Sequence, residues 1–183
     1  MVYVFLAEGF EPIEAVTPVD MLHRAGIEAV TVAIGSSLLV DGAHGVSLMA
    51  DVLFEDVDFS GTNMLVLPGG PGTSNYETHK GLCSLVRRCA SSGIPIAAIC
   101  AAPGFLGRLG VLEGRRATVY PGCDEGVTGV EYTGCFIEHD GNFITAVGPA
   151  ASSAFAAEII ETLLGREARL AVCRPMFFRE DGV

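Results

Sequence analysis

Uninterrupted apolar runs of strand length, each followed by a loop or a helical pattern, most constrain how this chain can fold. They cover residues 2–6, 29–34, 64–67 and 94–99. Strands that are buried on both faces of a sheet are apolar throughout, whereas half-exposed strands alternate. Strands that alternate with helices are joined by right-handed crossovers into an open, twisted sheet. The sequence therefore predicts an α/β fold with a mostly parallel sheet and helices on both faces.

Start and stop residues mark the other elements. Pro12, Glu14 in the first turn and Gly26 after the last apolar residue predict a helix over residues 12–25. Further helices are expected over 77–91, 102–109 and 150–164, a strand over 117–120, and hairpins joining 38–40 to 46–49 and 135–138 to 143–147. Because no Pro-, Ser- or Gly-rich linker divides the chain, a single domain over 1–183 is expected.

Composition excludes several classes of partner. Acidic residues outnumber basic ones by 22 to 11, for a net charge of -11, which argues against binding to nucleic acid or to an anionic membrane. No apolar stretch approaches the ~20 residues of a spanning helix. The six cysteines form neither a C-x-x-C pair nor a Cys/His ligand set, and no basic leader precedes the first strand. We therefore expect reduced thiols, a cytoplasmic location, and neither metal nor cofactor.

Three loops at the carboxyl ends of the predicted strands are expected to converge. They cover residues 7–14, 68–72 and 100–104. Open α/β sheets bind ligands in the crevice beyond the carboxyl ends of their strands. The candidate functional residues are therefore sought in these loops.

Cys100 is the first candidate, because it closes the apolar run 94–99 and precedes the small-residue stretch 101–104. A buried strand that turns sharply into a helix at a thiol suggests a nucleophile elbow with sulfur as the nucleophile. Helix-terminal N–H dipoles there favour the thiolate, which is the reactive form. The alternative is a small buried core residue, the commoner role of a free cysteine.

The glycine-rich stretch at 68–72 is the second candidate, since glycine lets backbone N–H groups approach a ligand closely. Its spacing fits neither a P-loop nor a dinucleotide fingerprint. A tight turn without a ligand is an equally supported alternative. Beside Cys100, the amides of Gly70 and Ala101 would form an oxyanion site with two donors.

Glu14 is the carboxylate expected to face Cys100, because its helix begins directly after the first strand. The alternative is a surface carboxylate that complements the helix dipole. If Glu14 is buried against the thiol instead, its pKa is raised and its protonated form donates a hydrogen bond to the thiolate. No histidine lies in these loops, so surface or core roles are expected for the four histidines, His23, His44, His79 and His139.

Several motifs together resemble the ThiJ/PfpI superfamily. They are Ala-Ile-Cys-Ala-Ala-Pro at 98–103, Ala-Glu-Gly-Phe-Glu-Pro-Ile-Glu at 7–14 with Pro-Val-Asp at 18–20 and Arg-Ala-Gly at 24–26, Leu-Pro-Gly-Gly at 67–70, and Gly-Pro at 148–149. Within the superfamily, the chain is most similar to the branch of the parkinsonism-associated protein deglycase. The resemblance spans nearly the whole chain.

The resemblance implies a flavodoxin-like three-layer sandwich that forms a homodimer. It also implies that Cys100 is a reactive, oxidisable nucleophile and that Glu14 is a carboxylic acid hydrogen-bonded to it. Gly70 and Ala101 match the backbone donors of the family, and Gly69 belongs to the same motif.

Two further positions matter for the comparison. Arg24 matches an arginine of the first helix that pairs with an acidic neighbour, expected here to be Glu11. Tyr120 stands before Pro121, where the human-type branch has a histidine. A neutral phenol is a poor base near pH 7 but can donate a hydrogen bond to an oxyanion. Because Ala101 occupies the place where peptidase and amidotransferase relatives often have histidine, neither proteolysis nor amidotransfer is expected.

Three functions are compatible with this sequence. The first is a stress-response enzyme of glyoxalase or deglycase type that acts on small reactive dicarbonyls or glycated adducts through Cys100. The second is a redox sensor or chaperone in which Cys100 is oxidised to sulfinate without turnover. The third is a non-catalytic dimeric binding protein with an inert thiol. Whether the chain turns over a substrate is left open by the sequence.

Overall fold

A seven-stranded sheet in the order β10-β11-β7-β6-β1-β2-β5 forms the centre of the computed structural model, which describes residues 1–178. The parallel strands are β1 (Val2–Leu6), β2 (Ala29–Ala33), β5 (Val52–Leu53), β6 (Met64–Leu67), β7 (Ile96–Ile99) and β11 (Phe143–Ala146). At one edge β10 (Ile137–Asp140) runs antiparallel to β11. The predicted mostly parallel sheet is confirmed.

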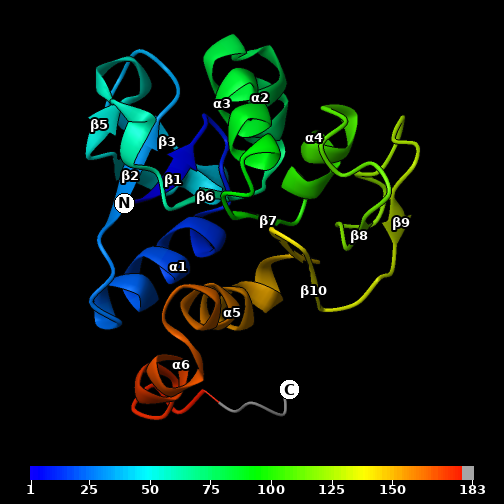
Figure 1. Ribbon diagram of the computed structural model, residues 1–183. Helices are drawn as coiled ribbons and strands as arrows, with labels where there is room; N and C mark the ends of the chain where they lie inside the picture. The colour runs from blue at the N-terminus through cyan, green and yellow to red at the C-terminus, as the bar shows by residue number, and fades with distance from the viewer. Residues whose placement is uncertain (179–183) are drawn as a thin grey trace.

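Helices cover both faces of this sheet, as Figure 1 shows. On one face, α1 (Pro12–Arg24) packs beside α5 (Ser152–Leu164), and α6 (Arg166–Cys173) lies against the outer side of α5. The other face is covered by α2 (Ser74–Thr78), α3 (Lys80–Ser91) and α4 (Ala102–Arg108). The three-layer α/β sandwich is therefore confirmed, with α6 as an addition outside the layers.

Side chains of the central strands alternate between two cores. In β1, Val2 and Val4 pack toward α1 and α5, whereas Tyr3 and Phe5 pack toward α3 and α4. The side chains are buried on both faces because each face carries a helical layer. This burial accounts for the uninterrupted apolar runs in the sequence.

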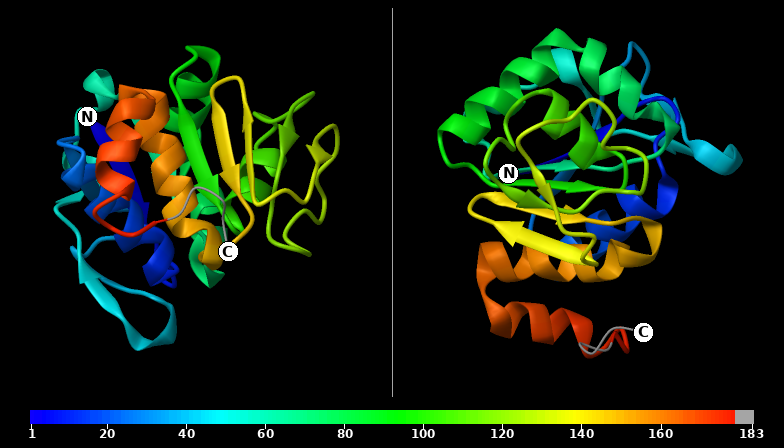
Figure 2. Two further views of the ribbon diagram at one scale, coloured as in Figure 1. Left: turned by 90° about the horizontal axis from the view of Figure 1, so that it is seen from below. Right: turned by 90° about the vertical axis from the view of Figure 1, so that its right-hand side faces the viewer.

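Two small sheets lie outside the central one. The hairpin predicted to join 38–40 to 46–49 is present as β3 (Leu39–Asp41) and β4 (Ser47–Met49). It projects from the body of the molecule in Figure 2. The strand expected over 117–120 is shorter and earlier: β8 (Arg116–Ala117) pairs in parallel with β9 (Glu131–Tyr132) beside α4. Tyr120 therefore lies in the loop that follows β8.

The prediction of a single helix over 77–91 is wrong. The segment is divided into α2 and α3 at His79, whose φ of -83° and ψ of 94° are extended rather than helical. The His79 ring nitrogen Nδ1 accepts a hydrogen bond from the Leu82 N–H at 3.0 Å and so caps α3. No helix within residues 1–178 combines the length and apolar character needed to cross a membrane.

Candidate active site

Cys100 lies between the end of β7 and the start of α4, in a sharp turn. Its φ of 63° is in the left-handed region, which costs a non-glycine residue about 1 kcal/mol or more. The Cys100 N–H donates to the Ala146 carbonyl at 2.9 Å, and its own carbonyl accepts from the Tyr120 N–H at 2.8 Å. These bonds hold the strained turn and place the thiol at the carboxyl edge of the sheet.

Glu14 reaches the same point from the first turn of α1. Its exposed fraction is 0%, so it is not a surface carboxylate. The Gly69 N–H donates to Oε2 at 2.8 Å. A Cβ added to Gly69 would lie 2.7 Å from the Cys100 Cβ and 2.8 Å from Oε2. The glycine, the carboxyl group and the cysteine are therefore in mutual contact, and only glycine fits between them.

The surroundings of Glu14 raise the pKa of its carboxyl group to near neutrality. Burial raises its pKa to about 7, and the nearby charge of Glu11 adds to this effect. The hydrogen bonds from Gly69 and Cys100 oppose the rise in pKa. Within the described residues, Oε1 has no nitrogen or oxygen partner, which leaves the thiol as its polar neighbour. A protonated Glu14 can therefore donate its O–H to sulfur.

The pKa of the Cys100 thiol is shifted in the opposite direction from that expected. Burial, followed by the charge of the Glu14 carboxylate, raises it to about 12, while the amides of Gly70 and Ala101 lower it. The thiol therefore keeps its proton while Glu14 is ionised. When Glu14 holds the proton, the carboxylate no longer repels the thiolate, so the two groups titrate as a coupled pair.

The loops after β1 and β6 are joined to each other around this pair. The Glu11 N–H donates to the Gly69 carbonyl, and the Gly72 N–H donates to the Gly9 carbonyl, both at 3.0 Å. Gly70 adopts a φ of 96°, and a Cβ there would lie 2.6 Å from the Glu11 nitrogen. The glycine-rich stretch is thus a closely packed loop that directs one amide to Glu14 and the next to Cys100.

Tyr76 contacts the strand ends that carry these loops. The sequence analysis did not identify it. Its buried hydroxyl lies 3.0 Å from the carbonyl oxygens of both Phe5 and Pro68. The tyrosine on α2 therefore ties the end of β1 to the end of β6. Its position after the glycine-rich stretch carries no motif that would have marked this role.

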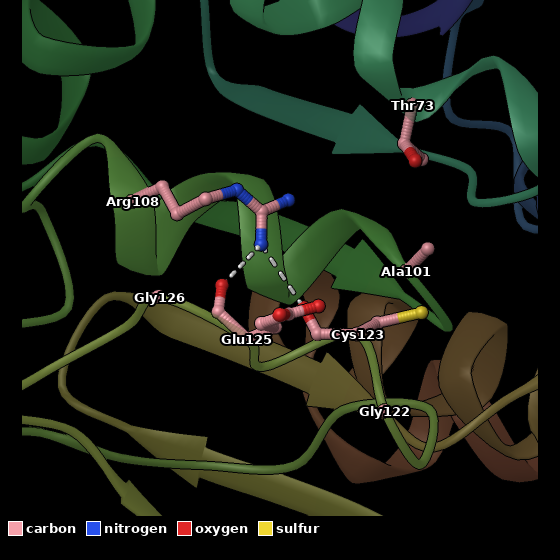
Figure 3. A pocket seen from close by; sticks show the side chains of 7 residues that line it. All are labelled: Thr73, Ala101, Arg108, Gly122, Cys123, Glu125 and Gly126. Carbon is pink, nitrogen blue, oxygen red and sulfur yellow. Dashed lines mark hydrogen bonds between the residues drawn. The ribbon is translucent and has the colours of Figure 1, made fainter.

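A cavity of about 370 Å³ opens beside Ala101, the residue that follows Cys100. Ala101 lines it on one side and the segment 122–126 on the other, and Cys100 keeps 8% of its surface exposed. Figure 3 shows Arg108 crossing the cavity, with its guanidinium group donating to the carbonyl oxygens of Cys123 and Glu125. The same guanidinium pairs with Glu77 at 2.7 Å. Sequence analysis did not single out Arg108 or Cys123.

The sequence model of the DJ-1/PfpI family matches residues 1–162. The chain belongs to the DJ-1/PfpI family. Its superfamily resemblance is therefore confirmed. The crystal structure of DJ-1beta from Drosophila melanogaster superposes with a TM-score of 0.93 at 31% identity and covers 97% of both chains. Oxidised DJ-1 from Toxoplasma gondii superposes with a TM-score of 0.92 at 30% identity, again over 97% of both chains. The fold is thus that of DJ-1.

Sequence relatives include proteins of two lengths. A deglycase of Pyrococcus horikoshii is 34% identical over 86% of this chain and 95% of its own length. DJ-1 homolog B of Arabidopsis thaliana is 35% identical over 98% of this chain but only 42% of its own length. This DJ-1/PfpI chain therefore spans less than half of that plant protein.

The backbone of Tyr120 contacts the candidate site, but its side chain is directed elsewhere. The Tyr120 N–H contacts the Cys100 carbonyl, whereas its ring lies against Gly148, where an added Cβ would be 3.2 Å from a ring carbon. The tyrosine is 48% exposed. The four histidines bond elsewhere, His23 to the Ala29 carbonyl, His44 to Glu11, His79 to the Leu82 N–H and His139 to Glu158.

The expected pairing of Arg24 with Glu11 is wrong. Arg24 pairs with Asp20, one turn earlier on α1, with Nε 2.7 Å from Oδ2. Glu11 precedes the first turn of α1 and instead lies 3.2 Å from His44. Arg24 is in the last turn, and at 1.5 Å of rise per residue the helix separates the two by roughly 20 Å. Arg24 therefore lies at the far end of the helix that carries Glu14.

Proposed function

We propose that this chain is a cysteine-dependent enzyme that acts on small reactive dicarbonyls or on their glycated adducts. The observation that carries the proposal is the contact of a buried carboxyl group, of pKa about 7, with the Cys100 thiol beneath two backbone N–H donors. A group that gains and loses a proton near neutral pH suits acid–base catalysis. The deglycase name of the Pyrococcus horikoshii relative supports the substrate class.

The proposed reaction begins from the state in which Glu14 holds the shared proton. The Cys100 sulfur forms a bond to the aldehyde carbon, and the carbonyl electron pair moves to oxygen. The amides of Gly70 and Ala101 stabilise the resulting oxyanion. Glu14 gives its proton to that oxygen and then takes the proton from the same carbon, whose electron pair moves into the neighbouring carbonyl to form an enediol. Glu14 returns the proton to the neighbouring carbon, so the first carbon reaches the oxidation level of a thioester while the second carbonyl is reduced to an alcohol. Water releases the hydroxy acid and restores the thiol.

The Cys100→Ser variant, compared with reduced wild-type protein, provides the first test of turnover. We expect purified protein to consume methylglyoxal, and Cys100→Ser to lose at least about a hundredfold in kcat/KM, because the nucleophile is removed. Cys135→Ser is the matched control, since that thiol is exposed and lies outside the cavity. Equal rates in wild type and Cys100→Ser would contradict the proposal.

Redox sensing is the second candidate, and the small exposed fraction of Cys100 favours it. With 8% of its surface exposed, the residue is reached more easily by a peroxide than by a bulky adduct. The same amides would then hold an oxidised sulfur. Oxidation of Cys100 without measurable consumption of a dicarbonyl would favour this function over the enzyme.

We also propose that the chain is a homodimer. Exposed apolar side chains gather on α1 and on the projecting β3–β4 hairpin, namely Ile13, Val16, Leu39, Val46 and Met49. Val16 and Met49 line the same groove, of about 230 Å³, between the helix and the hairpin. Apolar patches of this kind on a folded chain mark protein contacts. Such a dimer would cover Ile13 and Val16, the exposed apolar residues in the first turns of α1, the helix that carries Glu14.

A further inference from the structure

Cys123 is a second thiol on the cavity beside Cys100, and the proposed reaction does not use it. It is half-buried and lines the cavity opposite Ala101, the residue that follows Cys100. In Figure 3 the Cys123 side chain extends toward the Ala101 side of the cavity, away from the Arg108 guanidinium. Cys123 therefore borders a solvent-connected space whose opposite wall is formed by the residue next to Cys100.

The backbone places Cys123 one turn away from a residue bonded to Cys100. The Tyr120 N–H donates to the Cys100 carbonyl at 2.8 Å, and the Cys123 N–H donates to the Tyr120 carbonyl at 2.9 Å. The Cys123 carbonyl also lies against Gly104 of α4, where an added Cβ would clash with it. The segment that carries Cys123 is therefore packed directly on the helix that begins after Cys100.

This segment has the means to bring its sulfur closer. A disulfide requires Cα atoms about 4.4–6.8 Å apart. Gly122 and Gly126 bound the segment with φ values of 85° and 76°, and glycine changes its dihedral angles at little cost. Arg108 holds the segment through carbonyl oxygens, at 3.1 Å from Cys123 and 3.3 Å from Glu125. Both hydrogen bonds are made to main-chain carbonyl oxygens, so the segment must lengthen or exchange them as its Cα atoms approach Cys100.

We propose that Cys123 is the resolving thiol of Cys100, so that peroxide converts the pair reversibly to a disulfide. This inference rests on the proposed reactivity of Cys100. The Cys100 thiolate attacks a peroxide oxygen, the O–O bond breaks, and the leaving hydroxide takes the proton held by Glu14, so that a sulfenic acid and water form. The Cys123 sulfur then attacks the sulfenic sulfur, the S–O bond breaks, and a second water leaves with the Cys123 proton. The peroxide is reduced, and the two thiols are oxidised together.

The disulfide would protect the active site from irreversible oxidation. A sulfenic acid that meets a second peroxide becomes a sulfinic acid, which thiols do not reduce. A neighbouring thiol on a short segment has an effective concentration of roughly millimolar. Condensation with Cys123 therefore outruns the second oxidation at micromolar peroxide. The crosslink would also draw the cavity wall over Cys100 and stop turnover until a thiol reductant reopens it.

Peptide mapping by mass spectrometry tests this proposal on the full reduced chain. After brief treatment with micromolar hydrogen peroxide and alkylation of remaining thiols, wild type is expected to yield a peptide that links Cys100 to Cys123. Dithiothreitol should release it, and a nonreducing gel should show a monomer. In Cys123→Ser, the sulfinate at Cys100 should rise about tenfold or more over wild type. Cys135→Ser, the matched control, should behave as wild type.

The result on wild-type protein decides the test by itself, even if the Cys123→Ser variant does not fold. Sulfinate at Cys100 without a link to Cys123, or a link only between two chains, would overturn the resolving role and leave the proposed function standing. A Cys100 that stays a thiol under peroxide and that does not turn over a dicarbonyl would overturn both.

Discussion

At the scale of single residues, the burial of Glu14 has a measurable cost in stability. Its folded pKa of about 7 exceeds the ordinary value of 4.5, so the folded chain binds more protons between these values and loses stability as pH rises through them. We predict that Glu14→Gln raises the free energy of unfolding by about 3 kcal/mol at pH 8 and leaves it nearly unchanged at pH 4. Urea unfolding at both values measures this, with exposed Glu113→Gln as the control. An equal effect at both pH values would show that folding does not raise the pKa of Glu14.

Gly69 is the second residue with a specific expectation. A methyl group there would clash with both Cys100 and the Glu14 carboxyl oxygen. We predict that Gly69→Ala lowers the free energy of unfolding by roughly 1–3 kcal/mol and slows alkylation of Cys100, because the two groups must move apart. Gly35→Ala is the control, since nothing lies within 4 Å of its added Cβ. Unchanged stability and alkylation in Gly69→Ala would argue against the contact.

The residues of the candidate site could be proposed from the sequence, but their electrostatics could not. Family motifs pointed to Cys100 and Glu14 and to the glycine amides, and the structure brings these groups together. The direction of the thiol pKa depends on the depth of burial and on the charge state of Glu14, which no motif encodes. Arg24 was misassigned because helical distance separates it from Glu11.

At the scale of elements, α4 and the segment 122–126 meet at Gly104. In an ordinary helix, Gly→Ala stabilises by about 1 kcal/mol. Here the added Cβ would strike the Cys123 carbonyl. We therefore predict that Gly104→Ala destabilises the chain, and that it lowers the yield of the peroxide crosslink because the segment is pushed outward. Chemical unfolding and peptide mapping measure the two effects. A gain in stability would mean that the segment is not packed on α4.

Elements with a buried face were predictable, and short or exposed ones were not. The continuous apolar runs of β1, β6 and β7 predicted buried strands, and α1 begins and ends where its proline and glycine signals indicate. β5 is a two-residue edge strand and α6 is eight residues long, so both are too short for a clear periodicity in the sequence. The break between α2 and α3 depends on a side-chain cap at His79, which periodicity does not register.

At the scale of the whole molecule, the proposed dimer links assembly to the site. We predict a dimer in analytical ultracentrifugation, and a shift toward monomer in Val16→Asp, because a charge would be buried in the apolar contact. Leu164→Asp is the matched control: Leu164 is similarly exposed, at 52% against 45% for Val16, but lies at the end of α5. A monomeric wild type would contradict the dimer, and equal dissociation in both variants would contradict its placement.

The pH dependence of Cys100 alkylation, followed by peptide mapping in wild type and in Glu14→Gln, tests the coupled pair most directly. In wild type, the account predicts a first rise in rate near pH 7, where the pair loses one proton, and a second rise at high pH, where the thiol itself ionises. Glu14→Gln should lose the first rise and titrate in one step, at a lower pH than the second wild-type step. Identical single-step profiles in the two proteins would contradict the coupling of Glu14 to Cys100.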